Sequence, residues 1–279
     1  MSIEEIPVID ISCQSLTESA ASSLLRACNE FGFFFIRNHG LSKELYQKLI
    51  SGADQLFSSP EETKQKLTMG ASSYTPRFVV SPFFESFKVS GPNFSASAAA
   101  QGFTQSLFGH QATEFSNCNA YLRINGFTPR SMNEEEEEEE ELEVFKKHTD
   151  LSYVTIVFQN DIRGLQMRLK GGDWMDVRPR PSEDDNLMVN IGDFMEAWSN
   201  GRLRSAVHRV VLRKNNMKRF SMAFFLTTED DDKEIYAPSE IVGEGKSRLY
   251  RPFSTQQYRL FKEKSGVNAR YALKDIIGT

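Results

Sequence analysis

The amino-acid sequence predicts a mainly β protein, a sandwich or jelly roll, with helices in its N-terminal part. From residue 147 to about residue 228, short runs of strand-forming residues are separated by turn residues. This spacing is typical of all-β folds and differs from the alternating strands and helices of α/β folds. Upstream, residues 15–67 carry helical periodicity and helix-start signals. No internal repeat and no glycine-rich phosphate loop is evident.

The N-terminal elements follow in order. Residues 6–12 (IPVIDIS) alternate apolar and polar side chains and predict a short strand. Residues 15–30 place apolar side chains at helical spacing after a Ser/Thr start, and residues 31–40 (FGFFFIRNHG) suit a buried strand that ends in a turn. Residues 42–67 predict two helices divided at Ser59-Pro60, because proline favours the first turn of a helix.

The middle of the chain has no clear periodicity. Residues 70–116 are rich in Ser, Ala, Gly and Phe, and we expect loops there with at most one short helix. Eight consecutive glutamates follow at residues 134–141, and mutual repulsion favours an acidic loop over residues 133–143 rather than a folded element. An acidic interaction segment is the alternative. Removing these eight charges from the net charge of −5 leaves +3.

The β-rich part contains five runs that predict strands: YVTIVFQ, GLQMRLKGGDWMDVRP, NLMVNIGD, LRSAVHRVVLR and KRFSMAFFLT. We therefore divide the chain into a supporting region of helices and strands, residues 1–116, and a jelly-roll core with a C-terminal segment, residues 117–279. Both parts are expected to form one compact unit.

Composition narrows the class of protein. The chain has 39% apolar and 25% charged residues, as in ordinary globular proteins, and no apolar run approaches the roughly 18 residues of a membrane span. The N-terminus lacks a signal-peptide pattern, and the 3 cysteines are widely spaced, which together predict a cytosolic protein without disulfides. Without its eight consecutive glutamates the chain is nearly neutral, which predicts no nucleic-acid or membrane partner. Nothing indicates the oligomeric state.

A metal site is indicated by His148, Asp150 and His208. Side chains two positions apart share one face of a strand, so His148 and Asp150 can converge, and His208 lies in a strong strand pattern downstream. Two histidines and one carboxylate can hold iron(II) on one octahedral face and leave three positions open. The alternative is that these residues bind no metal and are a surface histidine, an ordinary acidic residue and a core histidine whose hydrogen bonds are made within the fold.

A carboxylate-binding pair is indicated by Arg219 and Ser221, which share one face of a predicted strand. Because they follow His208 closely, we expect this strand to be its antiparallel neighbour. The guanidinium fork matches a carboxylate and the hydroxyl adds a donor, so the pair could anchor one end of a dicarboxylic acid whose other end chelates the metal. A structural salt bridge of Arg219 is the alternative.

These residues resemble those of the iron(II)- and 2-oxoglutarate-dependent dioxygenases, in particular the plant-type branch that contains gibberellin oxidases. The resemblance extends to the segments EFGFFFIRNHG, NAYLRINGF, LMVNIGDFMEAWSNGRLRSAVHRVV and RFSMAFFL. The resemblance implies a distorted double-stranded β-helix, or jelly roll. It implies that His148, Asp150 and His208 bind iron and that Arg219, Ser221 and Asn125 surround 2-oxoglutarate (2OG).

The resemblance also implies the reaction. Dioxygen would be the second cosubstrate, ascorbate a candidate reductant, and 2OG would be converted to succinate and carbon dioxide. The substrate would be a small organic molecule, a plant hormone or specialised metabolite, and hydroxylation, desaturation or successive oxidation would fit the same site. An oxidase of the same fold that does not consume 2OG is an alternative.

Two departures from the family pattern stand out. Phe127 occupies the position of a tyrosine, so one hydroxyl donor to 2OG is missing. Over residues 110–125 the chain also passes directly from HQATEFS to the strand that contains NAYLRINGF, whereas relatives carry a long helical stretch between these two segments. Loss of that supporting helix leaves a further alternative, a catalytically impaired binding or regulatory protein that keeps the jelly roll.

Overall fold

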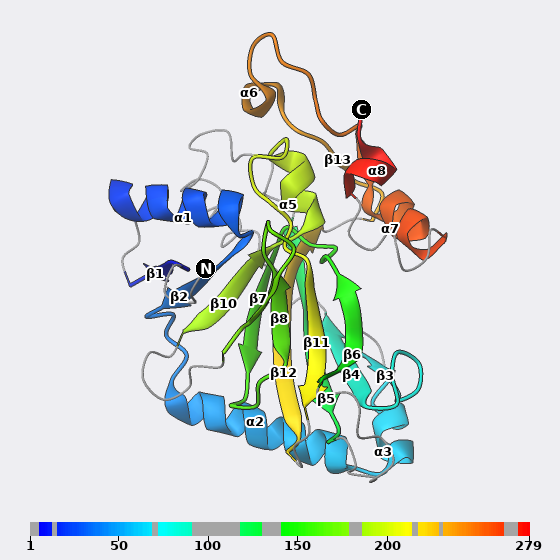
Figure 1. Ribbon diagram of the computed structural model, residues 1–279. Coiled ribbons are helices and arrows are strands. Elements are labelled where there is room, and N and C mark those ends of the chain that lie inside the picture. Colours follow the sequence, from blue (N-terminus) through cyan, green and yellow to red (C-terminus); the bar gives the residue numbers. More distant parts are fainter. Residues whose placement is uncertain are drawn as a thin grey trace.

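A computed structural model of the chain describes residues 6–12, 16–68, 72–90, 118–129, 141–178, 186–213, 217–228, 231–264 and 273–279. Two β-sheets dominate these residues (Figure 1). The large sheet has eight strands in the order β1-β2-β10-β7-β12-β5-β4-β3, and the small sheet has four in the order β6-β11-β8-β9. The expected mainly β fold is confirmed, and the strands predicted after residue 147 supply three of the eight strands of the large sheet and three of the four strands of the small sheet.

The strand bounds show how far apart in the sequence neighbouring strands lie. The large sheet consists of β1 (Val8–Asp10), β2 (Phe33–Arg37), β3 (Ser72–Thr75), β4 (Phe84–Ser90), β5 (Cys118–Phe127), β7 (Val154–Gln159), β10 (Leu187–Ile191) and β12 (Arg219–Thr228). The small sheet consists of β6 (Glu141–His148), β8 (Leu165–Arg168), β9 (Trp174–Asp176) and β11 (His208–Arg213). A two-stranded ribbon joins β13 (Glu234–Ile235) to β14 (Phe253–Ser254).

The helices lie at opposite ends of the strands. The first three are α1 (Glu18–Glu30), α2 (Lys43–Ser58) and α3 (Glu61–Lys66), and the expected division at Ser59-Pro60 is confirmed. Next come α5 (Asp193–Trp198), α6 (Ser239–Val242), α7 (Thr255–Lys264) and α8 (Leu273–Ile277). These four gather at one end of the sheets, and α2 crosses near the other end (Figure 1). Among the described residues, no helix has the length and apolarity needed to cross a membrane.

The expectation of loops in residues 70–116 was wrong for two described segments, Ser72–Thr75 and Phe84–Ser90, whereas residues 76–83 between them form turns as expected. β3 and β4 extend the large sheet, and β4 pairs with β5 from Phe84 opposite Phe127 to Ser90 opposite Tyr121. β4 is stabilised by pairing with β5, a segment more than thirty residues away in the sequence, and local periodicity does not reveal such pairing. Residues 91–117, which include most of the short connection before β5, lie outside the described residues.

The acidic loop ends earlier than expected. β6 begins at Glu141, so the last residues of the segment 133–143 lie in a strand. Arg213 on β11 pairs with Glu141, and Arg209 pairs with Glu143 at 3.0 Å, which offsets the repulsion between the glutamates. Residues 130–140 lie outside the described residues, and the division of the chain at residue 116 stays a prediction.

The large sheet has two faces with different neighbours. On its outer face, Phe220 and Met222 of β12 join Phe57 of α2 in an apolar cluster. Gly126 on β5 permits this contact, because a Cβ atom there would lie 2.7 Å from the Phe57 ring. The inner face looks toward the small sheet, as the contact of Phe84 with Phe145 of β6 shows, with ring centroids 4.9 Å apart.

A buried carboxylate ties α3 to the edge of the large sheet. Glu85 on β4 is 1% exposed and accepts from the Lys64 ammonium at 2.6 Å, from the Tyr74 hydroxyl at 2.6 Å and from Arg77 at 2.8 Å. Burial by itself would raise the pKa of Glu85, but these three donors outweigh it and lower the pKa below its ordinary value of 4.5. The stabilisation is therefore present above about pH 4.5 and is lost as the pH falls through the folded-state pKa.

We predict that Glu85→Gln lowers the free energy of unfolding by about 3 kcal/mol at pH 7, because it leaves the buried Lys64 ammonium poorly compensated. Urea unfolding at pH 7 and at pH 3 measures this loss, which should shrink at the lower pH. Glu44→Gln removes an exposed pair with Lys48 and should change stability by less than about 0.5 kcal/mol. Equal losses in the two variants would contradict the assignment.

Candidate metal centre

His148, Asp150 and His208 converge on one point near the ends of two strands. His148 is the last residue of β6 and pairs with His208, the first residue of β11. The Asp150 Oδ1 atom lies 3.7 Å from His148 Nε2 and 3.5 Å from His208 Nε2. The three ligand atoms all lie within 4.8 Å of one another, as binding of one metal ion requires.

The sequence placed His148 and Asp150 on one strand, and this detail was wrong. β6 ends at His148, so Asp150 lies two residues beyond the strand. Its carboxylate is held instead by the Asn190 amide on β10, whose Nδ2 atom donates to Oδ2 at 2.9 Å. The other oxygen, Oδ1, is left to face the two imidazoles.

Backbone carbonyls fix the orientation of both imidazoles. Nδ1 of His148 lies 2.8 Å from the Lys146 carbonyl oxygen, and Nδ1 of His208 lies 3.0 Å from the Ala206 carbonyl oxygen. A carbonyl oxygen can only accept, so each Nδ1 carries a proton, and in the neutral form of the ring Nε2 then presents a lone pair. Both lone pairs are therefore available on the side of Asp150.

The ionisation states suit a divalent cation. Burial, followed by the proximity of His208, lowers the pKa of His148 to about 3, so its imidazole is neutral at physiological pH. For Asp150, burial would raise the pKa, but the two histidines and the Asn190 amide outweigh it and lower the pKa. Two imidazole nitrogens and one carboxylate oxygen form the ligand set that non-haem iron(II) enzymes use.

A buried cation faces the same interior space. The Arg219 side chain at the start of β12 is 1% exposed, and its Nη2 atom donates to Gln159 Oε1 at 2.7 Å. Its guanidinium carbon lies 4.8 Å from the centre of the Phe127 ring, and its Nε–H has no hydrogen-bond partner among the described residues. Burial lowers the pKa of Arg219 to about 9, so the group is still charged at neutral pH.

No carboxylate within the described ranges forms an ion pair with Arg219. The alternative of a structural salt bridge therefore finds no support in this part of the chain. A charge that is buried without a counterion is costly, and a bound anionic ligand would remove that cost.

The expectation that Arg219 lies on the strand next to His208 was wrong. β11 belongs to the small sheet, whereas β12 lies between β7 and β5 in the large sheet. The guanidinium and the two candidate histidines thus come from opposite sheets.

Strand register brings the other predicted residues together. Ser221 lies opposite Asn125, whose amide donates to the Ser221 hydroxyl oxygen at 3.3 Å, and Arg219 lies opposite Phe127. Ser221 also lies opposite Gln159 on β7, a residue that sequence reasoning missed. Its role depends on which strands pair, and the sequence offered no signal for that pairing.

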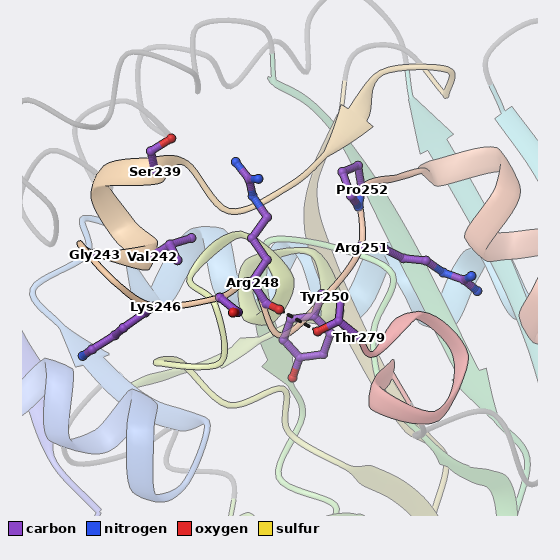
Figure 2. A pocket seen from close by; sticks show the side chains of 10 residues that line it. Ser239, Val242, Gly243, Lys246, Arg248, Tyr250, Arg251, Pro252 and Thr279 are labelled. Atoms are coloured by element: carbon purple, nitrogen blue, oxygen red, sulfur yellow. Dashed lines mark hydrogen bonds between the residues drawn. The ribbon is translucent and has the colours of Figure 1, made fainter.

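A separate cavity of about 670 Å³ lies at the C-terminal part of the chain (Figure 2). Its lining includes Val242 of α6, Arg248, Tyr250 and the C-terminal Thr279. None of the metal-ligand candidates and none of the residues around Arg219 lines it, so we do not assign it to the candidate site.

We predict that Asn190→Ala weakens the affinity for iron(II) by about 10- to 100-fold, because Asp150 loses the amide that orients its carboxylate. Anaerobic calorimetric titration with iron(II) measures the change. Asn29→Ala is a matched control, since the Asn29 amide on α1 binds the Arg202 carbonyl and not a metal-ligand candidate. An unchanged affinity in a folded Asn190→Ala protein would contradict the prediction.

Comparison with known proteins gives matches along most of the chain. Residues 118–228 match the 2OG-Fe(II) oxygenase superfamily, and residues 6–91 match the family described as non-haem dioxygenase in morphine synthesis, N-terminal. The chain is 41% identical to a gibberellin 20-oxidase-like protein of Arabidopsis thaliana, over 94% of this chain and 92% of the relative. It is 30% identical to gibberellin 20 oxidase 2 of the same plant, over 93% of this chain and 78% of that protein.

The alignment with the gibberellin 20-oxidase-like protein spans 308 residues, more than the 279 of this chain. That relative therefore carries residues within the matched region that this chain lacks.

Solved structures share the fold. The dioxygenase for auxin oxidation from rice superposes with a TM-score of 0.75 at 24% identity, covering 98% of this chain and 100% of that chain. JOX2, solved in complex with 2OG, Fe and JA, superposes with a TM-score of 0.77 at 23% identity, covering 98% of this chain and 89% of that chain.

Proposed function

Because the chain belongs to the 2OG-Fe(II) oxygenase superfamily, we propose that His148, Asp150 and His208 bind its iron(II) and that Arg219 and Ser221 anchor its 2OG. The protein is a 2OG-dependent dioxygenase. When bound, iron(II) supplies the chemistry by which dioxygen oxidises a C–H bond of a small organic substrate while 2OG becomes succinate and carbon dioxide.

The observation that carries the 2OG assignment is the buried, uncompensated guanidinium of Arg219. Its Nε–H lacks a partner, and the planar fork of donors fits a carboxylate. Since the metal-ligand candidates lie on the opposite sheet, a dicarboxylate could chelate iron at one end and reach Arg219 with the other. Gln159 and the Phe127 ring hold the guanidinium in place for this contact.

The hydroxyl of Ser221 is prepared to donate. Its oxygen accepts from the Asn125 amide at 3.3 Å and from Arg219 Nη1 at 3.5 Å. With both bonds accepted, the hydroxyl hydrogen can be directed to a ligand carboxylate. Asn125 therefore acts mainly by orienting Ser221.

Aromatic side chains from both sheets line the space near these groups. Phe84 lies between Phe127 and Phe145, with ring centroids 5.1 and 4.9 Å away, and Phe145 lies 4.7 Å from the His148 ring. This shell would limit access of water and strengthen the pairing of charges inside the site.

The substrate we propose is a plant hormone or a specialised metabolite, with hydroxylation as the default outcome. The relatives named as gibberellin oxidases support this class, although a shared fold does not specify one compound. We also propose a cytosolic location, which the buried free thiol of Cys28 supports.

Anaerobic absorption spectroscopy tests the two binding assignments. Addition of iron(II) and then 2OG to the parent protein should produce a visible charge-transfer band. His208→Ala should abolish the band, because one of three metal ligands is lost. Arg219→Ala should keep the band but require about 100-fold more 2OG, because one charge-assisted anchor is lost.

The outcome separates the remaining alternatives. A folded parent protein without the band would contradict the proposed site and favour a non-catalytic binding protein. A band without succinate formation during oxidation of any substrate in a screen of plant hormones and metabolites would favour an oxidase that does not consume 2OG.

A second prediction concerns the departure at Phe127. Phe127→Tyr supplies a hydroxyl beside Arg219 and should tighten 2OG binding about tenfold, equivalent to about 1.4 kcal/mol. Titration of the charge-transfer band with 2OG measures the change, and iron(II) affinity without 2OG is the internal control. Unchanged or weaker 2OG binding with unchanged iron affinity would show that no hydroxyl is missing at this position.

A further inference from the structure

Asp193, the first residue of α5, is the centre of a buried hydrogen-bond network beside the candidate metal centre. Its side chain is 1% exposed. Oδ1 accepts from the Ser205 hydroxyl at 2.7 Å, and Oδ2 accepts from the Thr149 hydroxyl at 2.9 Å. Oδ2 also accepts from the Tyr258 hydroxyl at 2.9 Å and from the Lys262 ammonium at 2.6 Å, both on α7.

This network reaches both segments that carry metal-ligand candidates. Thr149 stands between His148 and Asp150, and the backbone N–H of Asp193 donates to the Asp150 carbonyl oxygen at 2.9 Å. Ser205 precedes His208 by three residues, and its backbone N–H donates to the Glu196 carboxylate on α5. One short helix therefore binds the loop after β6 and the segment before β11.

Lys262 forms an ion pair with Asp193 and also donates hydrogen bonds directly to the loop after β6. Its side chain is 9% exposed, and its ammonium donates to the Thr149 hydroxyl at 2.9 Å and to the Thr149 carbonyl oxygen at 3.3 Å. Within the described part of the chain, Lys262 forms the one ion pair of Asp193. Without it, a buried carboxylate would be left uncompensated in contact with the segment that carries His148 and Asp150, and its neighbours would rearrange around it.

We propose that Lys262 and Tyr258 of α7 are positioning residues for the metal centre, which they reach through Asp193 and Thr149. The inference rests on the proposed iron site and adds helix α7 to it. Metal–ligand distances tolerate errors of only about 0.2 Å, so the position of Thr149 determines whether His148 and Asp150 can bind together. Partners that orient ligands from behind commonly contribute 10- to 100-fold in metal affinity.

The first test is Lys262→Met, which keeps the length and apolar stem of the side chain but removes its charge. Binding of Mn(II), followed by the loss of the free-ion electron paramagnetic resonance signal, should weaken by about 10- to 100-fold. Lys262→Arg should recover most of that loss. Arg259→Gln is the matched control, because Arg259 lies on the same helix and pairs with the exposed Asp231, and it should bind Mn(II) like the parent protein.

Thermal unfolding of the metal-free proteins distinguishes positioning from general stability. A purely structural role would lower the melting temperature of Lys262→Met and leave the Mn(II) affinity of its folded form within about twofold of the parent. That result would overturn the inference. If the parent protein itself binds no Mn(II), the proposed metal site fails instead.

Thr149 provides a second, milder test should Lys262→Met fail to fold. Thr149→Val keeps the shape but removes the hydroxyl that links Asp193 to the loop, and Mn(II) affinity should fall about tenfold. Thr149→Ser keeps the hydroxyl and should bind within about threefold of the parent. Equal affinities of the Val and Ser variants would contradict the proposed link.

Discussion

Adjacent residues of β12 and β5 point to opposite faces of the large sheet, and the placement of the candidate site depends on this alternation. Phe220 and Met222 face α2 in an apolar cluster, while Arg219 and Ser221 face the interior with Asn125. A shift of one residue in register would bury the cation against α2 and send phenylalanine into the site. Ten paired positions between the two strands hold the register in place.

Three buried charges show how structural and functional groups differ. Glu85 and Asp193 are each paired with a lysine from a helix, so their cost of burial is offset within the fold. Arg219 is equally buried and has no such partner among the described residues. The fold thus neutralises two of these charges internally, whereas the Arg219 guanidinium donates only to the neutral groups of Gln159 and Ser221 among the described residues, as the proposed binding of an anion at that point requires.

The metal-ligand candidates, in contrast, depend on contacts made through the backbone. The imidazoles are oriented by the carbonyl groups of Lys146 and Ala206. Asp150 lies beyond the end of β6 and not within the strand. Beyond the paired His148 and His208, α5 binds both segments, because Asp193 contacts the Asp150 carbonyl group and the Ser205 hydroxyl. The proposed contribution of α7 extends this support to the C-terminal part of the chain.

The sequence by itself determined which residues could do the chemistry. The His-x-Asp spacing, a downstream histidine and the Arg-x-Ser pair name side chains whose donor types suit a divalent cation and a carboxylate, whatever the strand order. It also determined the helices 43–58 and 61–66, because proline and capping residues act locally. Only the tertiary structure decided that β11 and β12 lie on opposite sheets and that β4 is a strand. It also decided the contacts of Asn190 with Asp150, of Gln159 with Arg219 and of Lys262 with Asp193. These outcomes depend on pairing between segments distant in sequence, and the free energy of such pairing comes from packing and burial that no short stretch of the chain contains.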